Sequence, residues 1–116
     1  MEIKSGPSGA DVRYLEPAVW GALTIARFLW GEMFKAYPFV ITSGGEGKHR
    51  TGSRHYDGRA ADVRTMDPTN EWELLDANRL VFRAELSRRL GDEYDVSISE
   101  KYKNVHIELD PKAPLR

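Results

Sequence analysis

The residues best suited to bind a metal ion lie in the stretch 53–62, which reads S-R-H-Y-D-G-R-A-A-D. His55 and Asp62 lie on either side of a glycine there, and a second imidazole, His106, follows near the C-terminus. Two imidazoles and one carboxylate form the three-ligand set of a catalytic zinc ion, whose fourth position is left for water. We therefore predict that these three residues bind zinc.

The small residues of the same stretch have physical uses of their own. Gly58 lets the backbone turn sharply where a side chain would clash, and Ala60 lets the chain pack closely beside the site. Beyond them, Ala60 and Asp62 alternate with Ala61 and Val63. This alternation predicts a strand that projects Asp62 from one face of a sheet.

The pattern S-x-H-x-x-G-x-A-x-D with a downstream histidine resembles the signature of the LAS-type zinc peptidases. These include D-Ala-D-Ala carboxypeptidases, phage endolysins that cut L-Ala-D-Glu bonds, and the Hedgehog signalling domain. Residues 104–111, N-V-H-I-E-L-D-P, are similar to the H-I-H-V-E-x-D-P ending of small phage and prophage members. The resemblance runs from about Phe39 to Pro111. It implies a zinc-dependent hydrolase, of phage or prophage origin, acting on peptidoglycan peptides of the cell wall.

Hydrolysis at zinc also needs a group that takes a proton from water and passes it to the leaving amine. The spacing of Glu100 from His106 resembles that of the catalytic glutamate in Hedgehog-type sites, so we expect Glu100 to be the base. Glu108 is the alternative, since it shares the strand face of His106. Many relatives place a catalytic glutamate or histidine where this chain has Lys103 and Asn104. That departure keeps open a second interpretation, a catalytically inactive zinc-binding structural or recognition module.

A second departure concerns the cation that holds the substrate. Many relatives have S-G-x-R, whereas residues 43–46 here are S-G-G-E. We expect Lys48 and His49 to stabilise the developing oxyanion instead. Arg50 and Arg54 would then bind an acidic peptide that carries D-Glu, diaminopimelate or a terminal D-Ala carboxylate.

Ser53 is expected to direct its hydroxyl toward local backbone and to shape the substrate-binding loop that presents His55. A Ser-His-Asp triad could be drawn from Ser53, His55 and Asp62. The sequence lacks the nucleophile elbow and the separate base that such a triad needs. We therefore do not interpret Ser53 as a nucleophile.

Composition narrows the class of protein further. The 116 residues suit a single domain, and the absence of cysteine excludes disulfides and thiolate metal sites. A formal net charge of −1 gives no general attraction to nucleic acid or to an anionic membrane. Neither a signal peptide nor a membrane-spanning segment is recognisable. We expect a chain made in the cytoplasm that reaches the cell wall after lysis or as a virion component, with no nucleic-acid partner and no membrane insertion.

The elements that must position these residues follow from hydrophobic periodicity. Pro17 opens a helix whose apolar face extends to Tyr37, with Pro38 as its end. A second helix is predicted from Asp67 and Pro68 to Gly91, with a buried face formed by Trp72, Leu75, Phe82, Leu86 and Leu90. Four strands are predicted at 39–42, 59–64, 94–99 and 105–109, and the first dozen residues are predicted to be loose. The result is an α+β fold, similar to the Hedgehog and D-Ala-D-Ala peptidase domains, with a small, mainly antiparallel sheet and two main helices.

Overall fold

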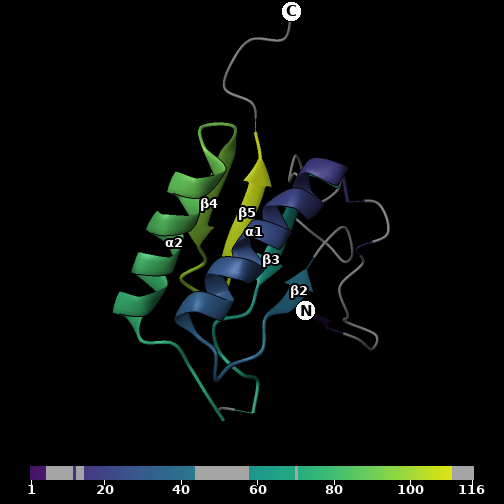
Figure 1. The fold of residues 1–116 in the computed structure, drawn as a ribbon. Helices are drawn as coiled ribbons and strands as arrows, with labels where there is room; N and C mark the ends of the chain where they lie inside the picture. Colours follow the sequence, from purple (N-terminus) through teal and green to yellow (C-terminus); the bar gives the residue numbers. More distant parts are fainter. Residues whose placement is uncertain (5–11, 13–14, 44–57, 70, 111–116) are drawn as a thin grey trace, which may run out of the picture.

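The computed structural model has two helices packed on one face of a five-stranded sheet (Figure 1). It describes residues 1–4, 12, 15–43, 58–69 and 71–110. The helices are α1, Pro17–Met33, and α2, Asp76–Leu90. The strands are β1, Glu2–Ile3; β2, Val40–Ser43; β3, Ala60–Val63; β4, Tyr94–Ile98; and β5, Val105–Leu109. The predicted α+β class with a mainly antiparallel sheet is confirmed.

The order of the strands across the sheet is β1-β2-β3-β5-β4. The β2–β3, β3–β5 and β5–β4 pairs are antiparallel, and β1 pairs in parallel with β2. The prediction of loose N-terminal residues was wrong for Glu2 and Ile3. Backbone hydrogen bonds hold this segment, from Glu2 N to Phe39 O at 2.8 Å and from Lys4 N to Ile41 O at 2.9 Å.

Helix α1 begins where predicted and ends earlier than predicted. Pro17 occupies its first turn, where a missing N–H costs nothing. The helix ends at Met33, because Phe34 leaves the helical conformation and the chain then turns through Tyr37 toward β2. Trp30 stabilises that turn by donating from Nε1 to Tyr37 O at 2.9 Å. The turn lets Phe34 and Phe39 pack edge-on against the Trp30 ring.

Helix α2 begins at Asp76, and the prediction that it begins at Asp67 was wrong. The Asp67 carboxylate accepts hydrogen bonds from the backbone N–H groups of Thr69 and Glu71, which closes a turn in place of a helical start. Leu75 is therefore outside the helix and 70% exposed. Phe82 and Leu86 are fully buried as predicted, and Gly91 ends the helix at φ 86°, a conformation that favours glycine.

The core lies between the helices and one face of the sheet. In the central strands, Ala61 and Val63 of β3 and Val105 and Ile107 of β5 are fully buried against the helices, and the burial of β5 alternates strictly. The intervening residues of β3 and β5 face the other side of the sheet. This alternation places the charged residues of these strands on the face that the two helices leave uncovered.

Candidate metal site

The β3–β5 ladder brings Asp62 and His106 directly opposite each other. Oδ1 of Asp62 lies 2.8 Å from Nδ1 of His106. Both side chains point away from the helices, because their neighbours Ala61, Val63, Val105 and Ile107 all point into the core. The structure therefore places together two of the three predicted zinc ligands, on rigid strands and on the same face of the sheet.

The contact is sheltered and remains accessible. The side chain of Asp62 is 16% exposed and that of His106 is 25% exposed. Partial burial strengthens their attraction, since water screens the charges less than it would at an open surface. The remaining exposure leaves a route by which an ion or a substrate could reach them.

The second nitrogen of His106 also faces a carboxylate. Nε2 lies 3.2 Å from Oε1 of Glu108, which is two residues further along β5 on the same face. Burial disfavours the imidazolium, but hydrogen bonds and charges from Asp62 and Glu108 outweigh burial and raise the pKa of His106 above its ordinary value of 6.5. The two carboxylates thus favour the protonated form of the His106 imidazole.

The start of β3 is held by the N-terminus of α1. The N–H of Glu16 donates to Gly58 O at 2.8 Å, and Nε of Arg59 donates to the Glu16 carboxylate at 3.1 Å. Gly58 has φ 71°, the left-handed conformation that the sequence analysis assigned to a sharp turn. Ala60, fully buried, follows at once. These contacts fix the strand that presents Asp62.

Several predicted site residues lie outside the described residues. They are the third ligand His55 and the substrate-handling candidates Lys48, His49, Arg50, Ser53 and Arg54. Their predicted roles stay predictions.

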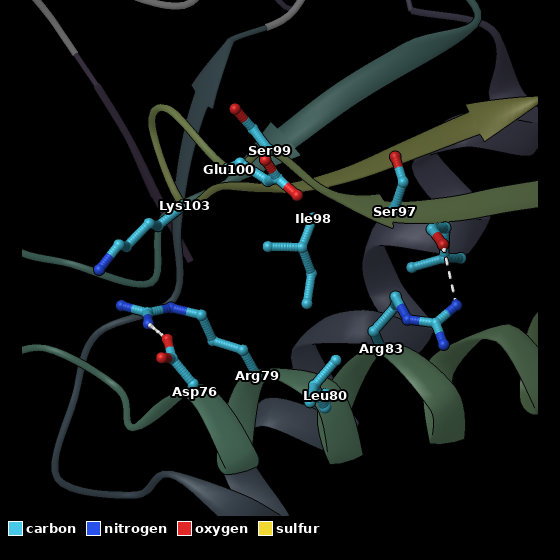
Figure 2. A pocket seen from close by; sticks show the side chains of 10 residues that line it. Asp76, Arg79, Leu80, Arg83, Ser97, Ile98, Ser99, Glu100 and Lys103 are labelled. Carbon is cyan, nitrogen blue, oxygen red and sulfur yellow. Dashed lines mark hydrogen bonds and ion pairs between the residues drawn. The ribbon is translucent and has the colours of Figure 1, made fainter.

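The two candidate bases lie in different surroundings. Glu108 contacts His106, whereas Glu100 is an exposed residue in the turn between β4 and β5. Figure 2 shows Glu100 at the rim of a hollow between β4 and α2, with Lys103 nearby and Arg79 on α2. The geometry links Glu108 directly to His106, and it places Glu100 in the turn of the β4–β5 hairpin, which carries His106 but not Asp62.

Lys103 and Asn104 shape the hairpin turn. Lys103 has φ 58°, and its N–H donates to Ser99 O at 2.7 Å. Its Nζ lies 3.5 Å from the Glu73 carboxylate. Asn104 O accepts from Ser99 N at 2.9 Å. The side chain three residues before His106 is thus a lysine that is paired with Glu73.

An acidic cluster beside Glu108 was not predicted. One carboxylate oxygen from each of Asp95, Glu108 and Asp110 lies within 4.8 Å of the other two. The register explains it, because Asp95 is opposite Glu108 on the face that carries His106. The sequence indicated both of the final strands. Aligning them in their correct antiparallel register would have predicted this cluster. Clustered carboxylates are not specific for zinc.

The donor set fits part of a zinc site. Zinc in proteins accepts imidazole nitrogen and carboxylate oxygen at about 2.0–2.2 Å, which puts neighbouring ligand atoms about 3.3 Å apart in a tetrahedron. Asp62 Oδ1 and His106 Nδ1, at 2.8 Å, need to separate by only a fraction of an ångström to reach that spacing. His55 completes the predicted set from outside the described residues.

A scan against protein-family models, a search of curated proteins and a search of solved structures found no match to this chain. Within the described residues, neither helix is long and apolar enough to cross a membrane.

Proposed function

We propose that this chain is a zinc-dependent peptidase of phage or prophage type, which hydrolyses an amide bond in bacterial peptidoglycan peptides. The observation that carries the proposal is the contact of Asp62 with His106 on neighbouring strands. The pattern around these residues resembles that of the LAS-type zinc peptidases, and the observed turn at Gly58 and strand at Ala60–Val63 agree with it. The α+β class is also the one that this resemblance implies.

His55, Asp62 and His106 would hold the zinc ion, which supplies a Lewis acid and lowers the pKa of a bound water. Nδ1 is the ligand atom of His106, since it faces Asp62. The Glu108 carboxylate would accept a hydrogen bond from Nε2–H and so fix the tautomer that leaves a lone pair on Nδ1. Glu108 is accordingly a positioning residue in this proposal.

Glu100 is the proposed base. Its carboxylate is exposed and would take a proton from the attacking water and pass it to the departing amine. The support for this role is its spacing from His106, as in Hedgehog-type sites. Glu108 remains the alternative, supported by its contact with His106.

A second candidate function is a zinc-binding module without catalysis. The pairing of Lys103 with Glu73 favours it. Many LAS-type peptidases have a catalytic glutamate three residues before the last histidine, whereas this chain has at that position a lysine whose ammonium group contacts Glu73. Such a module would use the same three ligands to stabilise a fold that recognises the cell wall or belongs to a virion.

Amine release from peptidoglycan tests the proposal. The zinc-loaded protein is incubated with purified peptidoglycan and with short muropeptides, and new amino groups are measured with fluorescamine. We expect release that a chelator stops and that Asp62→Ala and His106→Ala abolish. Asp92→Asn, in the exposed turn after α2, is the matched control and keeps full activity.

Two results would count against a peptidase. Release that persists in His106→Ala would show that the activity does not depend on this site. Stoichiometric zinc binding without release from several peptidoglycan types would favour the module.

A further inference from the structure

Strand β4 forms one edge of the sheet among the described residues. Its inner edge pairs with β5, and no described strand pairs with its outer edge. An edge strand presents backbone N–H and C=O groups that can pair with another extended chain. The outer edge of β4 is therefore a surface at which a peptide could add as a further strand.

The register identifies the backbone groups on that outer edge. Ser99 N donates to Asn104 O, and Asp110 N donates to Glu93 O, so the odd-numbered residues of this strand bond to β5. In an antiparallel pair the bonded residues alternate with residues whose N–H and C=O face the other way. Val96 and Ile98 thus direct their backbone groups outward.

A hollow of about 600 Å³ runs along this edge between β4 and α2 (Figure 2). One wall is the continuous segment from Val96 to Glu100, and the other is formed by Asp76, Arg79, Leu80 and Arg83 of α2. Asp76 is three and four residues before Arg79 and Leu80, and Arg83 is four and three residues after them, so the helix residues form a single helical face. The hollow is within the size range of ligand-binding clefts.

The lining is apolar in the middle and has an arginine on either side of that apolar part. Leu80, 56% exposed, faces Ile98 across the hollow, and Arg79 and Arg83 lie on either side of Leu80 (Figure 2). Arg79 is already neutralised, because its guanidinium contacts Asp76 at 2.7 Å and Glu73 at 3.2 Å.

Arg83 differs from Arg79. Among the described residues, its side chain makes one hydrogen bond, from Nη1 to Val96 O at 3.5 Å, and no carboxylate there pairs with it. That distance is at the outer limit of a hydrogen bond, so the interaction is weak. Arg83 thus weakly covers an outward carbonyl of the edge strand and keeps most of its capacity to bind an anion.

We propose that the outer edge of β4 and the facing surface of α2 bind an extended peptide that carries an acidic side chain. The peptide adds to the sheet beside β4, and a peptide N–H replaces Arg83 at Val96 O. The released guanidinium pairs with the acidic side chain of the peptide residue opposite Val96. The peptide residue opposite Ile98 faces the same side of the sheet and packs its apolar side chain on Leu80.

Charge complementarity selects this occupant. Arg83 is a cation with no carboxylate partner among the described residues, and bidentate pairing with a carboxylate is the contact that a guanidinium forms best. The site lies along the outer edge of β4 and makes no use of Asp62 or His106; Glu100, the proposed base, lies at its rim and is the residue that it shares with the proposed zinc chemistry.

Fluorescence anisotropy tests the proposal with a defined probe. The probe is a fluorescein-labelled, threonine-rich peptide of seven residues with glutamate and valine two positions apart, and chelator is present throughout. We expect saturable binding that weakens about tenfold in Arg83→Gln, the value of one charge-assisted hydrogen bond. Arg88→Gln, on α2 outside the hollow, should change binding by less than about twofold, since exposed ion pairs contribute little.

Two further experiments distinguish the contribution of backbone pairing with β4 from that of the charge on Arg83. Methylation of the peptide amides that face β4 should abolish binding, because it removes the strand-pairing donors. A peptide with lysine in place of glutamate should bind Arg83→Glu better than it binds the unchanged protein. Far-UV circular dichroism confirms that each variant is folded.

The proposal is overturned if the glutamate peptide fails to bind up to about 1 mM, or if amide methylation and charge exchange have no effect. Analytical sedimentation tests the remaining alternative, in which a second copy of the chain pairs with this edge of the sheet. A concentration-dependent dimer that the peptide does not dissociate would assign the edge to self-association and overturn the proposal.

Discussion

Asp62 Oδ1 and His106 Nδ1 lie 2.8 Å apart, although forty-four positions separate the two residues in the sequence. The cause is the antiparallel register of β3 and β5, in which these two residues are direct partners. A register shift of one residue would turn one of them into the core. The buried alternation of Val105, Ile107 and Leu109 prevents that shift, so the hydrophobic pattern itself sets the geometry of the candidate site.

The first prediction is zinc binding by this pair together with His55. Isothermal titration calorimetry should find one zinc ion per chain, and His55→Ala, Asp62→Ala and His106→Ala should each weaken binding by at least about tenfold. The control Asp92→Asn should bind zinc unchanged. If His106→Ala still bound zinc tightly, the metal site would not be on the β3–β5 ladder.

The second prediction concerns protonation of His106 in the metal-free protein. Its pKa is raised above 6.5 by Asp62 and Glu108 despite burial. The imidazolium therefore stabilises the fold fully below the unfolded pKa near 6.5, and that contribution is lost as pH rises through the higher folded pKa. NMR titration of the imidazole should show the raised midpoint, and Asp62→Asn should lower it.

The same titration couples to metal binding. Zinc needs a lone pair on the ligand nitrogen, so protons compete with it and its affinity should fall as pH decreases through the folded pKa of His106. A zinc affinity that does not change between about pH 8 and pH 5.5 would contradict ligation of the metal by His106.

The sequence could predict those features that depend on local pattern. The strict alternation of residues 105–109 predicted β5 with its observed ends, and Gly58 and Gly91 marked positions that do adopt positive φ. The partnership of Asp62 with His106 was reached through the metal motif. The strand pattern and the two glycine conformations have causes within a few residues of the chain, whereas the Asp62–His106 contact depends on the register of β3 and β5.

The features that were missed depend on contacts between distant segments. Strand β1 has two residues, and only its parallel pairing with β2 makes it a strand. The false start of α2 arose because Asp67 followed by proline is typical of helix starts and of turns alike, and the turn prevailed when Met66 paired with Glu73. The burial of Arg79 depends on Thr65, which hydrophobic periodicity does not detect.

The third prediction separates the two glutamates. Glu100→Gln should keep zinc and lose turnover by at least about 10²-fold, the lower end for general acid–base catalysis. Glu108→Gln should instead weaken zinc binding, because a neutral amide replaces the charged carboxylate that accepts the hydrogen bond from Nε2–H of His106. Turnover and zinc affinity are measured for both variants. If Glu100→Gln were fully active while Glu108→Gln bound zinc and was inactive, Glu108 would be the base and Glu100 would not.

The last prediction concerns a buried network that holds the hairpin bearing His106. Thr65 is fully buried, and its hydroxyl donates to Lys103 O and accepts from Nε of Arg79 at 2.8 Å. The network connects the chain after β3, helix α2 and the β4–β5 turn. It also holds Lys103 in its left-handed conformation.

Thr65→Val preserves the shape of the side chain and removes the hydroxyl, which leaves Nε of the buried Arg79 without its acceptor. The free energy of unfolding should fall by about 2 kcal/mol, the usual cost of an unsatisfied buried donor. Thr24→Val is the matched control, because its hydroxyl donates to Trp20 O on the exposed side of α1, and it should change stability by less than about 0.5 kcal/mol. Urea denaturation measures both variants. Equal stability of the two would mean that water or another acceptor replaces Thr65, and that the hairpin is held by its strand pairing alone.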